Sequence, residues 1–393
     1  MKKILSKINY PLLIITIIFA IFGLVMIYSS SNVSAILRYD VDSSYFFKKQ
    51  FIFEIAAFIG GFIFILKLPT KYYRYFSKIA IFGIIAVLAL LFIAGSVANG
   101  AKSWYEIGKM SIQPTEFAKI FLIIYLAVYY HRVSTKPKNK KINFIDMFFP
   151  LIPAIITFIL VAAQPDLGGA AIIALITAAI FFSLPFGKPA KKAIYKVGIL
   201  GIVIMAIAII FLGKNFLQGY QVNRILHFSK PCARVNYGDN DTGYQVCNGF
   251  IAIHNGGLFG VGLGNSTQKR LYLPDSHTDF IFPIICEELG LIAGILVIIG
   301  YFAMLFIILN IAKEARTLRN SILVFGIFIY LMAHILINIL GVLSLIPLTG
   351  VPLPFLSYGG SYNICVIAAL CIVQRVNIEN KEEAIKEKIA RIE

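Results

Sequence analysis

The sequence predicts an all-α polytopic membrane protein, and two observations support this fold class. Of its 393 residues, 59% are apolar and only 14% are charged, whereas soluble domains carry about 25% charged residues. The apolar residues are gathered in repeated runs of about 20, which is the length that an α-helix needs to cross the hydrocarbon core of a membrane. No long polar segment remains that could form a separate soluble domain.

About ten apolar runs are long enough to be transmembrane helices. The predicted spans are residues 10–30, 49–66, 77–95, 113–130, 146–164, 167–186, 197–213, 279–311, 321–345 and 361–375. The first span follows basic residues, as a signal peptide would, but it ends in no clear small-residue cleavage site, so we expect it to be retained. The eighth span is longer than a bilayer requires, so its ends are expected to project into water or the helix to tilt.

The distribution of Lys and Arg predicts that both termini are cytoplasmic. About two-thirds of the basic residues lie in alternate loops of short length, and this bias marks the cytoplasmic side. These segments contain Lys2, Lys3, Lys7, Lys67, Lys71, Arg74, Lys78, Arg132, Lys136, Lys138, Lys140, Lys141, Lys188, Lys191, Lys192, Lys196, Lys313, Arg316 and Arg319, together with Arg375 and the basic residues of the C-terminal tail, Lys381, Lys386, Lys388 and Arg391. The net charge of +17 therefore indicates contact with anionic membrane lipids. Nucleic-acid binding is not predicted, because no basic stripe alternates with aromatic residues.

This topology divides the chain into a membrane domain and a short tail. Residues 1–375 are predicted to form a single transmembrane domain, and residues 376–393 a charged cytoplasmic tail. Residues 214–278 then form a long outer loop between spans seven and eight. A connection of this length is far above the usual one and indicates a functional role. Within it, residues 243–264 are expected to form an amphipathic helix at the outer interface, followed by a glycine-rich turn.

Polar residues at the outer ends of four spans predict a cavity that opens outward. They are Glu116 and Lys119; Gln164 and Asp166; His277, Thr278 and Asp279; and Ser357, Tyr358 and Ser361. Structural roles compete with this interpretation. Glu116 and Lys119 are spaced to form an ion pair on one helix face, and Asp166 can cap span six. The loop that contains Ser357 can be a simple re-entrant turn.

Asp279 is the candidate catalytic residue, because a carboxylate near hydrocarbon is costly and usually functional. We expect it in the first turn of span eight, where the helix dipole favours an anion, although a purely structural carboxylate is equally common there. At about 100° per residue, Glu287 lies about 80° around the helix from Asp279 and about 12 Å deeper. Glu287 is therefore expected on the cavity floor, and Glu288, on the opposite face, in a pair inside the bundle. These acids do not converge, so no metal site is predicted.

Two further pairs of small residues suggest structural roles, one as a disulfide and one as a helix-packing face. Cys232 and Cys247 share the outer loop, in a compartment where disulfides persist, but spacing alone leaves their bonding open. Gly290 and Gly294 form a small-xxx-small face on span eight, which serves either a partner helix or internal packing.

Several outer motifs together resemble one family, the shape, elongation, division and sporulation membrane proteins typified by RodA, FtsW and SpoVE. The motifs are GAKSWYEIGKMSIQPTEFAK, QPDLGG, YQVNRI, LPDSHTDFIFPIICEELG and PFLSYGGS. They occur in order and cover nearly the whole chain. The resemblance implies a bacterial plasma-membrane glycosyltransferase that polymerises lipid II, the undecaprenyl-pyrophosphate-linked disaccharide-pentapeptide, into β-1,4-linked peptidoglycan strands. It also implies a class B penicillin-binding protein, a single-span transpeptidase, as partner.

The resemblance assigns roles to particular residues. It implies that Asp279 is catalytic and that Trp104, Gln113 and Glu116 contact substrate. Many members have Arg just before the Trp, whereas this chain has Lys102 and Ser103, which leaves the anion contact at this point open.

The implied reaction fits the residues. An attacking sugar hydroxyl needs a base to take its proton, and a departing pyrophosphate needs cations. The outer-side cations are Lys102, Lys109, Lys119 and Arg224. A divalent cation could serve instead, but the sequence offers no ligand set for one.

Two other functions remain open from the sequence. A transporter that flips lipid II would also carry intramembrane charges, although alternating access needs a site near the midplane. A non-catalytic scaffold for a transpeptidase would not need Asp279.

Overall fold

The computed structural model describes residues 5–98, 101–108, 110–135, 144–185, 232, 242–274 and 276–391. These residues form a helical bundle with one small antiparallel sheet. The predicted span at 197–213 lies outside the described residues, as do Lys109 and Arg224.

The first half of the chain supplies six of the described bundle helices. They are α2 (Tyr10–Leu37), α3 (Tyr45–Gly60), α4 (Tyr73–Ala94), α5 (Pro114–Ser134), α7 (Leu151–Ala163) and α8 (Leu167–Ser183). Short helical segments extend them at the ends: η1 (Gly61–Ile65), η2 (Thr70–Tyr72) and α6 (Phe144–Phe148). Helix α2 begins where the Asn9 side chain accepts a hydrogen bond from the Leu12 amide, which satisfies one of the donors that a helix start leaves unpaired.

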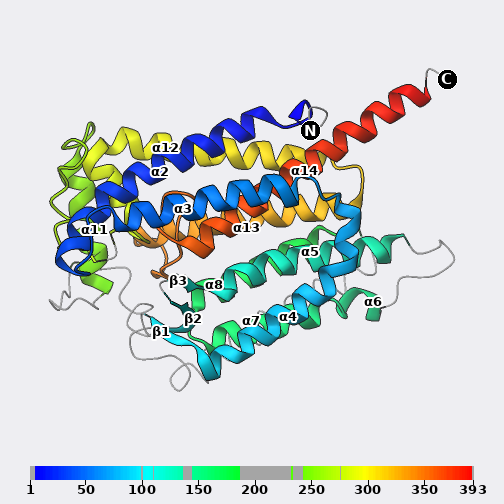
Figure 1. The fold of residues 1–393 in the computed structure, drawn as a ribbon, viewed down its shortest axis with the longest axis horizontal. Helices are drawn as coiled ribbons and strands as arrows, with labels where there is room; N and C mark the ends of the chain where they lie inside the picture. Colours follow the sequence, from blue (N-terminus) through cyan, green and yellow to red (C-terminus); the bar gives the residue numbers. More distant parts are fainter. Residues whose placement is uncertain are drawn as a thin grey trace.

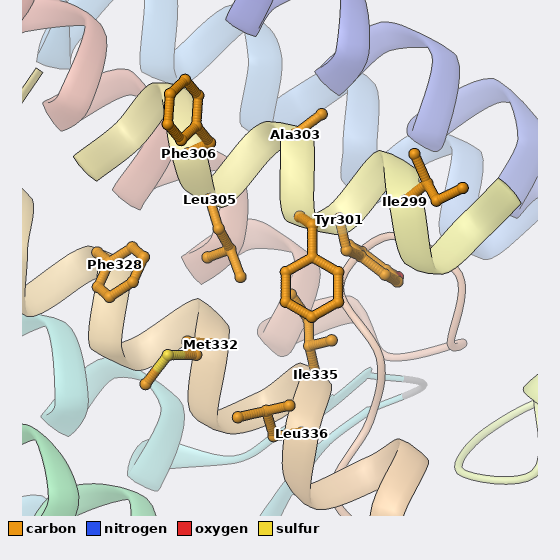
Figure 2. A pocket seen from close by; sticks show the side chains of 10 residues that line it. Ile299, Tyr301, Ala303, Leu305, Phe306, Phe328, Met332, Ile335 and Leu336 are labelled. Atoms are coloured by element: carbon orange, nitrogen blue, oxygen red, sulfur yellow. The ribbon is translucent and has the colours of Figure 1, made fainter. Parts of the chain in front are cut away.

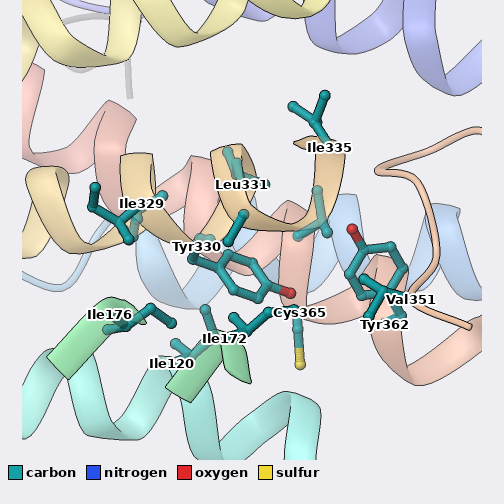
Figure 3. Packing of buried hydrophobic residues seen from close by; sticks show 14 of the residues in the cluster. Ile120, Ile172, Ile176, Ile329, Tyr330, Leu331, Ile335, Val351, Tyr362 and Cys365 are labelled. Atoms are coloured by element: carbon teal, nitrogen blue, oxygen red, sulfur yellow. The ribbon is translucent and has the colours of Figure 1, made fainter. Parts of the chain in front are cut away.

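The second half supplies α11 (Thr242–Gly256), α12 (Ile281–Lys313), α13 (Leu318–Val342) and α14 (Gly360–Ala390). Helix α11 confirms the helix expected in the outer loop. Helix α13 packs against α5, α8, α12 and α14, so it lies at the centre of the bundle. Figure 3 shows this core, where Ile120 of α5 and Ile172 and Ile176 of α8 surround Tyr330 of α13.

Seven of the described helices are long and apolar enough to cross a membrane. Large apolar side chains on their outer faces are exposed, such as Ile93, Ile79 and Phe306, which is the arrangement expected of surfaces that face lipid. The all-α polytopic fold class is therefore confirmed, and the protein is a multi-pass membrane protein. The number of ten spans and the cytoplasmic location of the termini remain predictions.

The two ends of the bundle differ in content. Figure 1 shows both chain ends toward the same end of the bundle, whereas α11 and the strands lie at the opposite end. The strands are β1 (Ser96–Ala98), β2 (Ala101–Ile107) and β3 (Met110–Ile112), paired in the order β1-β2-β3. The sequence motif around Trp104 did not indicate strands, because the pairing of short strands is not visible in a local apolar pattern.

Helix α12 is interrupted at Gly290, whose φ of 86° and ψ of 169° are not helical. The segment 257–262 lies against this break and bonds to it: Val261 N donates to Glu287 O at 2.9 Å, and Leu291 N donates to Gly257 O at 2.9 Å. The long eighth span is therefore divided by a break at Gly290. We expected only that this span would tilt or that its ends would project into water, and the break was not predicted.

Of the two roles left open for Gly290 and Gly294, a partner helix or internal packing, the structure supports internal packing. A Cβ atom at Gly290 would lie 2.2 Å from the carbonyl oxygen of Leu258, and one at Gly294 would lie 2.6 Å from Cys286 Sγ. The space beside both glycines is thus filled by other parts of this chain, which pack too closely for a larger side chain.

Helix α14 continues without a break through residue 375, where the tail was predicted to begin. Residues up to Asn380 are buried, and Arg375 bonds to Glu379 at 3.1 Å. The exposed part of the helix begins at Lys381.

Candidate active site

A loop between α13 and α14, residues 348–359, lies at the centre of the predicted site. Its backbone is held by side chains: Leu353 N donates to Ser357 Oγ at 2.8 Å, and Phe355 N donates to Asn363 Oδ1 at 3.1 Å. Ser357 is fully buried. The structure therefore gives Ser357 a role in shaping this loop.

Asp279 lies beside this loop, in a turn that precedes α12. The helix begins at Ile281 with Phe280 as N-cap, so Asp279 stands just outside the first turn in which it was expected. Asn338 of α13 explains its place, because the Asn338 amide donates both to Asp279 O at 2.8 Å and to Val351 O at 2.7 Å. The half-buried side chain accepts from Thr278 Oγ1 at 3.1 Å.

Gly350 brings the loop against the Asp279 carboxylate. Its φ of 72° is in the left-handed region that favours glycine, and a Cβ atom there would lie 3.5 Å from Asp279 Oδ2. The loop thus forms one wall of the Asp279 environment.

His277 is buried among aromatic rings, and its carbonyl accepts from Tyr358 N at 2.8 Å. The ring centroid lies 4.5 Å from that of Phe46 and 5.8 Å from that of Tyr358. Burial, together with the positive charge of Arg38, lowers the pKa of His277 to about 4. His277 is therefore a neutral residue that joins the two loops.

Gln113 connects three of the predicted elements. Its backbone nitrogen donates to Ser361 Oγ at 3.3 Å, and its side-chain Nε2 donates to Asp166 Oδ2 at 3.2 Å. Asp166 caps α8 by accepting from Gly169 N at 2.8 Å, which is the structural role left open by the sequence. Gln164 is buried and donates to Leu88 O at 2.7 Å.

Glu116 and Lys119 form the ion pair that their spacing allowed. Lys119 Nζ lies 2.7 Å from Glu116 Oε1, and both side chains are almost fully buried. Within the described residues, Lys119 is thus enclosed and paired, although it was predicted among the cations that meet a substrate.

Glu287 does not line a cavity floor, contrary to expectation. It is fully buried, and segment 266–268 surrounds its carboxylate with hydrogen bonds from Ser266 Oγ, Thr267 Oγ1 and Gln268 N. The fold of the outer loop, which no local pattern reveals, causes this difference. Glu288 pairs with Lys269 at 2.8 Å, so the prediction of a pair inside the bundle is confirmed.

Of the remaining predicted residues, those that the structure describes lie on or beside the strands and α11, at one end of the bundle (Figure 1). Trp104 and Lys102 are on β2; Trp104 is partly exposed, and its carbonyl accepts from Ser96 Oγ at 3.0 Å. Cys232 and Cys247 are joined by a disulfide, which links residue 232 of the outer loop to α11. In the part of the chain that the structure describes, no three His, Cys, Asp or Glu residues are grouped as a metal site would require.

Asn338 and His334 belong to this region, and the sequence analysis missed both. They are spaced i, i+4 in the apolar helix α13, so both side chains lie on one face. Polar residues inside an apolar span are a recognisable signal of function, and this spacing could have identified them.

The fold and the site define a multi-pass membrane protein in which a half-buried acidic residue, Asp279, lies beside the loop 348–359. The chain belongs to the FtsW/RodA/SpoVE family of cell cycle proteins, whose family model matches residues 10–382.

Similar proteins agree with this family. The protein named probable peptidoglycan glycosyltransferase FtsW from Bacillus subtilis (strain 168) is 38% identical over 408 residues, covering 99% of this chain and 96% of that protein. Stage V sporulation protein E of the same organism is 35% identical over 370 residues, covering 93% and 96%.

Solved structures share the fold. A chain from a peptidoglycan synthase complex that coordinates polymerization and crosslinking matches with a TM-score of 0.71 and 21% identity, covering 95% of this chain and 98% of that chain. The rod shape determining protein RodA of Thermus thermophilus matches with a TM-score of 0.64 and 21% identity, covering 95% and 97%.

Proposed function

We propose that the protein is a peptidoglycan glycosyltransferase that polymerises lipid II at the outer face of the plasma membrane, in cell elongation or division. The observation that carries the proposal is the placement of Asp279. Glu116, Glu287 and Glu288 are buried and bonded within the protein, and Asp166 caps a helix. Asp279 is only half-buried, beside the loop 348–359.

In the proposed reaction, Asp279 is the general base. A sugar hydroxyl oxygen of the acceptor attacks the anomeric carbon of the donor, and Asp279 takes the hydroxyl proton. The bond from the anomeric carbon to the pyrophosphate breaks, and its electron pair leaves with undecaprenyl pyrophosphate. One carboxylate suffices for inversion at the anomeric carbon, because pyrophosphate departs without an acid.

Positive charges would stabilise the departing pyrophosphate. Lys102, Lys109 and Arg224 remain candidates for this role, and a bound divalent cation is an alternative source of positive charge. The ion pair of Lys119 with Glu116 makes Lys119 a less suitable candidate. Trp104 on β2 would contact the sugar or lipid.

Asp279→Asn tests the assignment, because Asn keeps the shape of the side chain but cannot accept the proton. The variant should fold and insert, yet polymerise purified lipid II about 10²–10⁴-fold more slowly than the wild type. Asp42→Asn is the matched control, since Asp42 is an exposed acid in the loop between α2 and α3. Near-normal glycan strand synthesis by Asp279→Asn, with no contaminating polymerase, would reject the assignment.

The alternatives make different predictions in the same preparation. A lipid II flippase would move labelled lipid II across proteoliposomes but produce no glycan strands. A non-catalytic scaffold would do neither and would tolerate Asp279→Asn in cells.

We also propose a class B penicillin-binding protein as partner, with its single span in an apolar groove between α12 and α13. This groove has a volume of about 550 Å³ and is lined by apolar side chains, including Phe302, Phe306 and Met332 (Figure 2). Phe302 and Phe306 are more than half exposed, which suits contact with another apolar helix. Ala303→Trp should weaken co-purification, whereas Val87→Trp on α4 should not; equal co-purification of both would place the partner elsewhere.

A further inference from the structure

The side chain of His334 lies in a buried polar cluster that joins α5 to α13. Lys119 Nζ lies 3.2 Å from His334 Nε2 and 2.7 Å from Glu116 Oε1. Tyr330 OH donates to Glu116 Oε2 at 3.4 Å. His334 is 0% exposed and Lys119 is 1% exposed, so each polar atom of the cluster depends on its protein partners.

These contacts select one tautomer of His334. A lysine ammonium group can only donate hydrogen bonds, so His334 Nε2 must accept. The ring is then neutral and carries its proton on Nδ1, which lies 3.3 Å from the carbonyl oxygen of Pro352. That carbonyl can only accept, so both ring nitrogens are matched to their partners.

Two tyrosine rings hold the imidazole in this orientation. The Tyr362 ring stacks on it with centroids 4.6 Å apart, and the Tyr330 ring meets it edge-on at 4.8 Å. Figure 3 shows both tyrosines among the apolar side chains of the core. The groups that face His334 are therefore Glu116, Lys119 and these two phenols, all of them buried.

Pro352 continues this chain of contacts to Asp279. It adjoins Val351, whose carbonyl shares the Asn338 amide with the carbonyl of Asp279, and Gly350 lies against the Asp279 carboxylate. We propose that His334 is a positioning residue. It fixes the position of the loop 348–359 relative to the Glu116–Lys119 pair and thereby the position of Asp279. This inference rests on the proposed function of Asp279 as the base.

The first test compares His334→Gln with His334→Leu in lipid II polymerisation. A Gln side chain can accept from Lys119 and donate to Pro352, so we expect its kcat to stay within about 3-fold of the wild type, because the placement is kept. Leu fills the site but makes neither bond, and we expect kcat to fall about 10- to 100-fold with little change in KM. Equal activity of the two variants, whether high or low, would overturn the proposal.

The second test needs no variant to be active. The ¹⁵N spectrum of histidine-labelled wild-type protein should show His334 neutral and protonated at Nδ1, with its signal assigned by its loss in His334→Gln. A ring protonated at Nε2, or a charged ring at pH 7, would contradict the contact with Lys119 and overturn the proposal.

Two controls separate this inference from its foundations. Ile329→Ala removes buried packing from the same helix and should lower stability without a selective loss of kcat; a similar selective loss would show that packing alone explains His334→Leu. Asp279→Asn tests the proposed function itself. If Asp279→Asn abolishes polymerisation while His334→Leu does not, the positioning role fails and the proposed function stands.

Discussion

His277 and Asp279 are two residues apart in the predicted site, but they occupy different environments. His277 is enclosed by Phe46 and Tyr358, whereas Asp279 is half-buried beside Gly350. Burial disfavours the charged form of a side chain, so His277 is suited to structure and Asp279 to chemistry. The residue types alone did not distinguish these roles.

The low pKa of His277 predicts a pH dependence of stability. Its pKa is about 4 in the folded protein and about 6.5 in an unfolded chain. Below about pH 6.5 the unfolded chain binds a proton that the folded protein does not, so stability should be complete above that pH and fall toward pH 4.

Thermal unfolding of the detergent-solubilised protein between pH 4 and 7.5 would measure this effect. His277→Phe retains a ring among Phe46 and Tyr358 but cannot titrate, so its unfolding temperature should fall less over this range. An identical pH profile for the variant and the wild type would assign the dependence to other groups.

At the scale of single elements, α12 shows how a glycine changes the meaning of a long apolar run. The helix contains the non-helical Gly290, and segment 257–262 bonds to the backbone at that break. Broken helices within membranes persist only where the protein satisfies the freed backbone groups. The break therefore ties the outer loop, α11 included, to the helix that follows Asp279.

Gly290→Ala should destabilise this region. The backbone conformation at Gly290 is almost restricted to glycine, and an added Cβ would lie 2.2 Å from Leu258 O. We expect a loss on the order of 1–3 kcal/mol, seen as a lower unfolding temperature and faster proteolysis near residue 258. Gly83→Ala on α4 is the control, since nothing lies within 4 Å of its Cβ position; an equal effect of both changes would argue against strain at the break.

At the scale of the whole molecule, the long-range contacts gather around α13 and the loop that follows it. Helix α13 packs against α5 and brings His334 close to Glu116, although the two residues are 218 positions apart in the sequence (334 minus 116). Glu116 Oε2 lies 3.8 Å from His334 Nε2. The loop 348–359 then links the same region to Asp279 and His277. The predicted outer elements are thus connected by this one part of the chain.

The predicted topology places the outer loop, residues 214–278, outside the cell, and cysteine labelling can test this placement. In a background without the free cysteines Cys286, Cys365 and Cys371, Arg270→Cys should react with an impermeant thiol reagent on intact cells. Thr135→Cys should react only after permeabilisation, because the surrounding Lys and Arg residues favour the cytoplasm. The reverse pattern would invert the topology. Arg270 and Thr135 are both exposed, so access is comparable.

The sequence by itself determined the membrane fold class and most spans, and it indicated that Glu116 and Lys119 can form an ion pair. These depend on local composition and on spacing within one helix, where neighbours in sequence are neighbours in space. Only the tertiary structure decided that Glu287 is enclosed by segment 266–268, that α12 breaks at Gly290, and that His334 meets Lys119. Each of these depends on segments that are distant in the chain or on a backbone shape imposed by a packed neighbour, and no local apolar pattern records such contacts.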